Sequence, residues 1–539
     1  MMEHKDLPEH VEGPERQDGN VEYKLYLGSP SEDRLERLAT QMRYRLAQGG
    51  GEAFYELGVS DEGELVGIEE DSLERALSTF EKVAKIAGAD WRITRKVKGK
   101  SGVVVEIHVR QKLETPVQII VPLLGNVDSG KSTLIGVLCT GELDDGNGLS
   151  ASKVARYLHE IVNRRTSSVS THLLGFDSEG KSVNETLLDP LSENQVYLKS
   201  KKVVVFVDLA GHERYLRTTL KGVLGHTPDY ALVAVASNMG TVGTFKEHIG
   251  ISTILGIPFC VVITKIDLDR YNYKNTLDSV VRLLKLPGVN KIPIVIDSVE
   301  DAILAARHMS SGRITPIFSV SNVTGEGMDK LKTFLELLPP RLDWEKQASL
   351  PFVLYINDKF MVKGTGLVVS GLINQGSVSV GQVVLLGPFK DGSFREVKVK
   401  SIHVNRVNVF TSRAGQIASL AITNADYAEV EKGMVILDRG IKPIATRQIQ
   451  ADVHVLYHPT TIKPGYQCVI HLQTHRQPAR IIRIEGREAL RTGDKGRVVF
   501  WFMKKPAYVV ETQTLIFREG RTKGVGKVLS VYPLSPSAS

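Results

Sequence analysis

The sequence predicts a multidomain fold: a small N-terminal α+β domain, a P-loop α/β domain and two β-barrel domains. Three observations support this fold class. A glycine-rich phosphate-binding loop follows an apolar run, and three further apolar runs downstream each end in a polar loop. Beyond Pro340, short alternating segments with turn glycines continue to the C-terminus without a long amphipathic helix. A chain of 539 residues also exceeds what one hydrophobic core supports.

The N-terminal region divides into an acidic tail and a small domain. Residues 1–20 are polar and rich in acids, so we expect a disordered tail. Residues 21–113 are expected to form an α+β domain, with Ser31 capping its first helix and the glycines at 49–51 ending it. Strands at 53–59 and 64–68 are expected to flank a hairpin turn at 61–63. A helix at 71–86 and strands near 91–97 and 103–109 follow. This domain could bind RNA or a ribosomal surface, or serve as a passive docking module.

The phosphate-binding loop spans Gly125 to Ser132 and reads Gly-Asn-Val-Asp-Ser-Gly-Lys-Ser. It matches the pattern G-x-x-x-x-G-K-[ST], follows an apolar strand at 117–124 and precedes a helix at 132–140. Loop amides and the helix N-terminus would converge on a phosphate chain. Lys131 would reach the β- and γ-phosphates, and the Ser132 hydroxyl would bind Mg²⁺.

A second apolar run, 203–207, ends in Asp208-Leu209-Ala210-Gly211-His212. An acid at the end of a buried strand is suited to reach Mg²⁺ through water. Gly211 would offer its N–H to the γ-phosphate only while that phosphate is present, which predicts a nucleotide-sensing switch after it.

Two more apolar runs predict recognition of guanine. Residues 259–263 end in Thr264-Lys265-Ile266-Asp267, and the Asp267 carboxylate can accept hydrogen bonds from guanine N1–H and N2–H₂, a donor pair that adenine lacks. Residues 317–320 end in Ser321-Asn322-Val323, a loop placed to contact guanine O6. Four loops at strand C-terminal ends lie where open α/β sheets bind ligands.

These motifs resemble the GTP-binding domain of translational GTPases of the elongation factor Tu and 1-alpha class. The likeness continues through residues 364–371, similar to the second domain of that family, and 464–480, similar to its third. Residues 165–177 and 41–67 look most like the branch of GTP-binding proteins 1 and 2, and like an archaeal-type member. The expected domains are the tail 1–20, the α+β domain 21–113, the GTP-binding domain 115–340, barrel II 348–442 and barrel III 446–534.

The resemblance implies a GTP/GDP site with Mg²⁺ and a set of site residues. His212 would be catalytic, because the family's histidine at this position orients the water that attacks the γ-phosphate. Asp128 would hold a monovalent cation. The switch I hydroxyl that binds Mg²⁺ is either Thr166 or Ser168, depending on the alignment. The nucleotide-binding set is Asn126, Val127, Asp128, Ser129, Gly130, Lys131, Ser132, Thr133, Gly211, Thr264, Lys265, Asp267, Ser321, Asn322 and Val323; the metal set is Ser132, Thr166, Ser168 and Asp208.

Two positions depart from the family pattern. Asn126 and Ser129 replace two histidines of the elongation-factor loop, which backbone binding of phosphate should tolerate. Thr264 stands where many relatives have Asn and is expected to lose a side-chain amide that braces the phosphate loop. That would leave Asp267 as the main determinant of guanine specificity.

Composition and charge limit the binding partners and the cellular location that the sequence allows. Residues 446–539 hold 15 Lys and Arg against six Asp and Glu. The net positive charge of this segment therefore exceeds the net charge of +7 of the whole chain. A local excess of that size fits a nucleic-acid backbone, although a solvated basic face is the alternative. No run of about 18 apolar residues is present, and the acidic start does not fit a signal peptide. We expect a cytoplasmic monomer without a membrane partner and with reduced, buried cysteines.

The sequence thus predicts a Mg²⁺-dependent GTPase with an elongation-factor-like body. Its expected partners are the ribosome and aminoacyl-tRNA or a related RNA. One alternative is a GTPase of ribosome rescue or messenger RNA decay. Another is a GTP-dependent scaffold that recruits RNA-processing proteins through its N-terminal domain. The hypothesis of a metabolic P-loop enzyme of the sulfate-activating type is much weaker, because no second substrate site is evident in the sequence.

Overall fold

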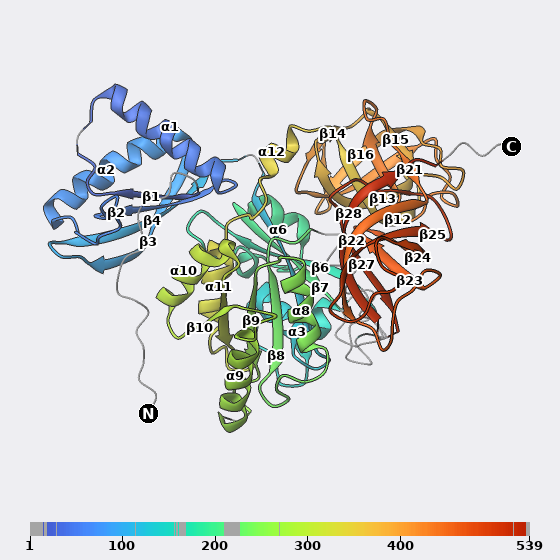
Figure 1. The fold of residues 1–539 in the computed structure, drawn as a ribbon. Helices are drawn as coiled ribbons and strands as arrows, with labels where there is room; N and C mark the ends of the chain where they lie inside the picture. Colours follow the sequence, from blue (N-terminus) through green and yellow to red (C-terminus); the bar gives the residue numbers. More distant parts are fainter. Residues whose placement is uncertain are drawn as a thin grey trace.

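The computed structural model describes residues 15, 19–28, 30–113, 115–155, 157, 160, 169–209, 227–268, 270–520 and 522–534. An α/β unit occupies the centre of the molecule, with the N-terminal domain on one side and two β-barrels on the other (Figure 1). Four predicted site residues lie outside the described residues: Thr166, Ser168, Gly211 and His212. Most of the expected tail 1–20 also lies outside them.

The N-terminal domain is a four-stranded sheet covered by two helices. The strand order is β1-β2-β4-β3, with β1 parallel to β2 and the other pairs antiparallel. Both helices pack their apolar side chains onto one face of the sheet. The elements are β1 (Val21–Lys24), α1 (Glu32–Gln48), β2 (Glu52–Leu57), α2 (Glu70–Ala87), β3 (Ala89–Lys98) and β4 (Val103–Gln111).

Two local expectations for this domain need correction. Ser31 precedes α1 at its N-cap, but its side chain makes no capping hydrogen bond. The strand expected at 64–68 is reduced to isolated bridges, one of which pairs Val59 with Leu65. Gly49 caps the C-terminus of α1 as expected, and an added Cβ there would lie 1.8 Å from the Glu52 carbonyl oxygen. The close approach explains why glycine is needed at this turn.

The central unit is a doubly covered α/β sheet of seven strands in the order β10-β11-β9-β8-β5-β7-β6. All pairs are parallel except β6 with β7, which is antiparallel at the edge. The strands are β5 (Val117–Gly125), β6 (Ser170–Phe176), β7 (Lys202–Asp208), β8 (Ala231–Ala236), β9 (Phe259–Thr264), β10 (Ile292–Val295) and β11 (Ile314–Ser319). The helices are α3 (Lys131–Thr140), α4 (Leu149–Val154), α6 (Glu193–Lys199), α8 (Phe245–Ile254), α9 (Arg270–Leu284), α10 (Val299–His308) and α11 (Met328–Leu337), with 3-10 turns η1 (Asn184–Thr186) and η3 (Met309–Ser311).

Two six-stranded barrels follow a short helix, α12 (Trp344–Ala348). Barrel II closes through the pairing of β15 with β16, and barrel III closes in the order β22-β25-β24-β23-β27-β28. The barrel II strands are β12 (Val353–Val362), β13 (Gly366–Gln375), β14 (Ser377–Ser379), β15 (Val383–Gly387), β16 (Arg395–Val404), β17 (Val407–Val409), β18 (Thr411–Arg413), β19 (Ile417–Thr423) and β20 (Val435–Asp438). Those of barrel III and its approach are β21 (Ala445–Thr446), β22 (Gln448–Tyr457), β23 (Gln467–Leu472), β24 (His475–Ile484), β25 (Lys495–Phe502), β26 (Ala507–Tyr508), β27 (Thr514–Glu519) and β28 (Thr522–Tyr532).

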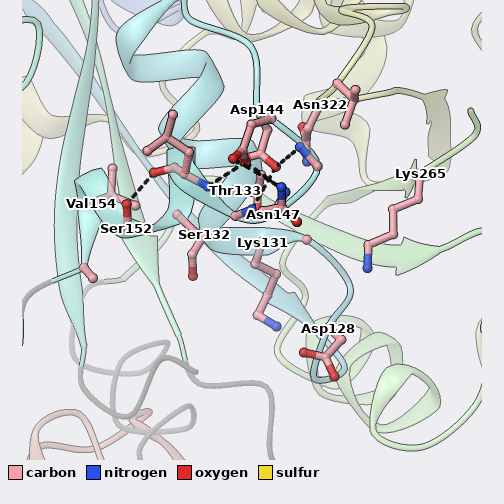
Figure 2. A pocket seen from close by; sticks show the side chains of 18 of the residues that line it. Asp128, Lys131, Ser132, Thr133, Asp144, Asn147, Ser152, Val154, Lys265 and Asn322 are labelled. Atoms are coloured by element: carbon pink, nitrogen blue, oxygen red, sulfur yellow. Dashed lines mark hydrogen bonds between the residues drawn. The ribbon is translucent and has the colours of Figure 1, made fainter. Parts of the chain in front are cut away.

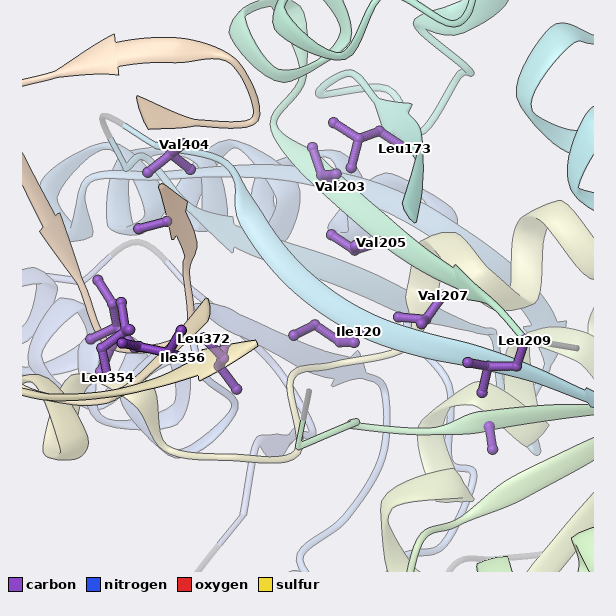
Figure 3. Packing of buried hydrophobic residues seen from close by; sticks show 14 of the residues in the cluster. Ile120, Leu173, Val203, Val205, Val207, Leu209, Leu354, Ile356, Leu372 and Val404 are labelled. Carbon is purple, nitrogen blue, oxygen red and sulfur yellow. The ribbon is translucent and has the colours of Figure 1, made fainter. Parts of the chain in front are cut away.

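One apolar cluster runs from the central sheet into barrel II (Figure 3). It contains Val203, Val205 and Val207 of β7 together with Leu354 and Ile356 of β12. The period of two in β7 points alternate side chains to this face, as in a strand buried on both sides. The burial of apolar surface therefore helps to fix barrel II against the central unit.

The N-terminal domain meets the central unit through buried charges. Lys202, at the first position of β7, donates from Nζ to Glu52 Oε2 at 2.7 Å, and Arg110 donates to Glu336 Oε1 at 2.7 Å. Arg307 of α10 forms an ion pair with Glu56 of β2. All of these side chains are buried. The interface lies at the end of β7 opposite Asp208, so the domain is docked away from the predicted nucleotide loops.

Two bulk expectations can be compared with the described part of the chain. There, no helix is long and apolar enough to cross a membrane. Cys139, Cys260 and Cys468 are all buried free thiols, as the sequence predicted.

Candidate nucleotide-binding site

The phosphate loop connects β5 to α3 and has the backbone shape that its glycines permit. Gly125 has φ +143° and Gly130 has φ +75°, and Asp128 also has a positive φ. A Cβ on Gly125 would lie 2.3 Å from the carbonyl oxygen of Ala234 on β8. Any larger residue would displace the start of the loop from the sheet.

The Lys131 side chain stabilises this loop by binding two of the loop's backbone carbonyl oxygens. Its Nζ donates to the carbonyl oxygens of Asn126 at 2.7 Å and of Gly125 at 3.1 Å. Burial lowers the pKa of Lys131 to about 8, against the opposing effect of Asp208 and Asp128. The ammonium is thus poised to gain from an anion, because a phosphate would stabilise its charged form.

Ser132 and Asp208 bring two oxygen ligands together from neighbouring elements. The Ser132 hydroxyl donates to Asp208 Oδ2 at 2.7 Å, and Asp208 is buried at the end of β7. A hydroxyl beside a carboxylate fits a small hard cation that retains several waters, as Mg²⁺ does. No group of three or more His, Cys, Asp or Glu side chains that could hold a metal ion occurs in the described residues. A Mg²⁺ ion held here would therefore depend on water and phosphate oxygens for its other ligands.

The guanine loops lie beside the phosphate loop and are braced by two hydroxyls. Thr264 Oγ1 donates to the Ser129 carbonyl oxygen at 2.9 Å. Thr264 has no side-chain amide to brace the loop, as expected, but its hydroxyl makes a hydrogen bond of its own to the loop. Ser321 Oγ accepts from the backbone N–H groups of Val323 at 3.2 Å and Thr324 at 3.0 Å, which folds the second guanine loop into a turn.

A single cavity of about 770 Å³ joins these loops. Figure 2 shows Lys131, Ser132 and Asp128 on one side of it, with Lys265 and Asn322 on the other. The predicted residues that line it are Val127, Asp128, Gly130, Lys131, Ser132, Thr133, Asp208, Lys265, Asp267, Asn322 and Val323. The volume suits a nucleotide.

Four predicted nucleotide-binding residues do not line the cavity. Asn126, Ser129, Thr264 and Ser321 instead support its walls, as Ser129 does when its hydroxyl donates to the Asn126 carbonyl oxygen at 2.8 Å. Their direct contact with a nucleotide stays a prediction, as do the roles of Gly211, His212, Thr166 and Ser168, which lie outside the described residues.

Sequence reasoning did not identify the wall formed by residues 144–149. The buried Asp144 carboxylate accepts from the N–H groups of Gly146, Gly148 and Ser150, and its own N–H donates to the Asn322 carbonyl oxygen at 2.8 Å. The loop after α3 is thereby attached to the guanine loop. The Asp-Asp-Gly-Asn-Gly run at 144–148 was the available signal for a tight turn near the phosphate loop.

A P-loop, an adjoining Ser–Asp pair and two guanine loops on an open sheet define a GTP-binding domain. Comparison with known proteins agrees: residues 117–341 match the elongation factor Tu GTP-binding domain family, and residues 366–437 match elongation factor Tu domain 2. The chain therefore belongs to the translational GTPase family.

Full-length relatives extend this likeness to nearly the whole chain. GTP-binding protein 2 of Mus musculus is 40% identical over 534 residues, covering 97% of this chain and 88% of that protein. GTP-binding protein 1 of Xenopus laevis is 42% identical over 516 residues, covering 95% and 78%. The GTP-bound GTPase-like domain of S. cerevisiae Ski7 has a TM-score of 0.59 at 14% identity, over 77% of this chain and 97% of that one, which shows a shared fold.

Family membership fixes the general activity. The protein is a translation-factor-like GTPase that binds guanine nucleotides and hydrolyses GTP. The fold expected from the sequence, a P-loop domain followed by two barrels with an added N-terminal domain, is confirmed.

Proposed function

We propose that this protein is a cytoplasmic monomer whose GTP form binds aminoacyl-tRNA or a related RNA, and that the ribosome stimulates its GTP hydrolysis. The observation that carries the proposal is a basic, partly aromatic face on barrel III. The net positive charge of residues 446–539 exceeds that of the whole chain, so the remaining domains are close to neutral. A localised excess of this kind attracts a phosphate backbone.

The face lies on the outer side of β24 and β25, which pair antiparallel. Arg480 stands opposite Trp501 in this ladder, and both side chains are exposed. Arg483 and Arg497 project from the same two strands with side chains more than half exposed. An exposed indole flanked by guanidinium groups can stack on an unpaired base while the arginines contact phosphates. We refer to Arg480, Arg483, Arg497 and Trp501 as the barrel III face.

GTP hydrolysis is proposed to depend mainly on the orientation of the attacking water and on neutralisation of the phosphate charge. Lys131 and the loop amides neutralise the phosphate charge, and His212 orients the attacking water when a partner brings it inward. Ser132 and Asp208, with Thr166 or Ser168, would hold Mg²⁺, which when bound would neutralise charge that develops on the phosphate oxygens. Asp128 is proposed to hold a monovalent cation beside the phosphates.

The barrel III face can be tested with aminoacyl-tRNA and a non-hydrolysable GTP analogue. Replacing Trp501 with Ala should weaken binding by about tenfold or more through lost stacking. Arg480→Ala should weaken it less and reduce its dependence on salt. The matched control is Arg439→Ala, which removes an arginine of similar exposure from barrel II and should leave binding unchanged. Equal loss in all three variants, or in none, would contradict this face as the RNA site.

The same assay separates the candidate roles. GTP-dependent protection of aminoacyl-tRNA from deacylation supports delivery of tRNA. Ribosome-stimulated hydrolysis without protection supports a role in rescue or messenger RNA decay.

A further inference from the structure

His248 occupies an unusual place beneath the phosphate loop. It lies on α8, is 1% exposed, and its Nδ1 accepts a hydrogen bond of 3.0 Å from the Gly125 backbone N–H. Gly125 is the first residue of the loop, and Lys131 binds the carbonyl oxygen of this same residue. The peptide units on the two sides of Gly125 are thus held by two buried side chains.

The imidazole acts here as a neutral acceptor. Burial, with a further contribution from Lys131, lowers the pKa of His248 to about 3. Because Nδ1 accepts from the backbone, the ring proton must be on Nε2. Nε2 is buried and has no hydrogen-bond partner among the described residues. A buried donor without a partner is costly, so an apolar side chain would be the better choice if α8 only needed to fill space.

The N-terminal end of α8 also contacts the second residue of the loop. A Cβ placed on Gly243 would lie 2.8 Å from the side chain of Asn126. Gly243 has φ +59°, so glycine suits both the backbone and the close contact there. Two consecutive loop residues, Gly125 and Asn126, therefore lie against α8 and the turn that precedes it.

Barrel III also contacts this helix. Lys523 of β28 forms an ion pair with Glu247, the residue immediately before His248. Each side chain of this pair is 30% exposed, so the contact lies at the edge of the interface between barrel III and the central unit. Because Glu247 and His248 are adjacent in the chain, a movement of barrel III relative to the central sheet would displace His248.

We propose that His248 is a positioning residue of the phosphate loop, and that barrel III influences the rate of nucleotide dissociation through Lys523, Glu247 and His248. The Nδ1 bond orients the Gly125 N–H at the point where β5 becomes the loop. Without this bond, the loop amides that bind the phosphates would no longer be fixed in position relative to the sheet.

The acceptor role is tested by three substitutions at one site. In His248→Asn the side-chain oxygen can occupy the place of Nδ1, in His248→Gln it lies one bond further out, and in His248→Leu there is no acceptor. We expect the dissociation rate of a fluorescent GDP to rise about five- to tenfold for Leu and Gln, and much less for Asn. Thermal unfolding of each variant shows whether it is folded. Equal rates for Asn and Leu in folded variants, or rates unchanged from wild type in Leu, would overturn the proposal.

The link to barrel III is tested by combining variants. Lys523→Met should speed GDP dissociation in the wild-type background and have no further effect in His248→Leu, because the two residues act in one path. The control is Lys527→Met, an exposed lysine on the same strand, which should leave the rate unchanged. Additive effects of Lys523→Met and His248→Leu would contradict the path through His248.

Discussion

At the residue scale, Lys131 is the side chain whose chemistry depends most on the bound nucleotide. With its pKa lowered to about 8 by burial, part of the Lys131 population is neutral in the free protein at mildly basic pH. A phosphate restores the charged form, so binding must take up a proton wherever the free amine is neutral. The contribution of Lys131 to GDP affinity is therefore fully present well below pH 8 and is lost as pH rises above it.

Calorimetry checks this linkage. At pH 8.5, GDP binding should take up about three quarters of a proton, as deduced from binding heats in buffers of different ionisation enthalpy. At pH 6.5 the uptake through Lys131 should vanish. Equal proton uptake at the two pH values would show that the Lys131 pKa does not change on binding.

The sequence predicted the residues of this site whose roles follow from a short motif. Lys131, Ser132, Asp208 and Asp267 could be identified because their neighbours along the chain define the loop. His248 could not, since its partner Gly125 is 123 positions away and its own neighbours carry no motif. The hydrogen bond of the Thr264 hydroxyl was not predicted for a related reason, because its acceptor, Ser129, becomes adjacent only when β9 and the loop come together.

At the element scale, the buried charges between β2, β4, β7 and α11 determine how firmly the N-terminal domain is docked. Glu52 Oε2 accepts from Lys202 at 2.7 Å and Oε1 accepts from Arg110 at 2.8 Å. Burial raises the energy of the charged form of Glu336, but Arg110 and Arg92 outweigh it and hold the pKa of Glu336 below its usual value. Each carboxylate is therefore needed to neutralise cations that water cannot reach.

Replacing Glu52 with Gln should destabilise the protein by about 3 kcal/mol or more, because Arg110 would keep its positive charge in a buried site and Lys202, whose pKa burial already lowers, would lose the carboxylate that favours its charged form. Denaturant unfolding followed by fluorescence measures the effect, and replacing Trp344 and Trp501 with Phe in every variant leaves Trp91 as the reporter of the N-terminal domain. The matched control is Glu64→Gln, which breaks the exposed pair with Lys100 and should cost less than about 1 kcal/mol. Similar costs for both variants would mean that the buried network does not hold the domain.

Most elements with a strong apolar pattern were predicted, but the central strand β8 and the edge elements were not. The apolar runs of β5, β7, β9 and β11 indicated buried strands, and the structure confirms them. The edge strands β6 and β10 escaped prediction. One of the four residues of β10 is Pro293, and the strand is only half-buried, as edge strands often are. The isolated bridge at Val59 likewise replaced an expected hairpin strand, since a turn signal alone does not supply pairing partners.

At the scale of the whole molecule, the central unit is held on two sides that serve different purposes. The N-terminal domain is fixed by buried charges at the end of the sheet remote from the nucleotide cavity. Barrel III reaches α8 near the phosphate loop and carries the basic face proposed for RNA. In this arrangement, the proposed RNA binding on barrel III and nucleotide binding in the cavity would be linked through the proposed contact path, as a GTP-dependent switch requires.

The central claim is that the ribosome is the partner that activates hydrolysis. The most direct measurement is the GTP hydrolysis rate of the wild-type protein and of His212→Ala, each with and without purified ribosomes. We predict that ribosomes stimulate the wild type by at least about tenfold, equivalent to lowering the activation barrier by about 1.4 kcal/mol, and that His212→Ala loses the stimulation while it binds GTP normally. A wild-type rate unchanged by ribosomes would contradict the claim.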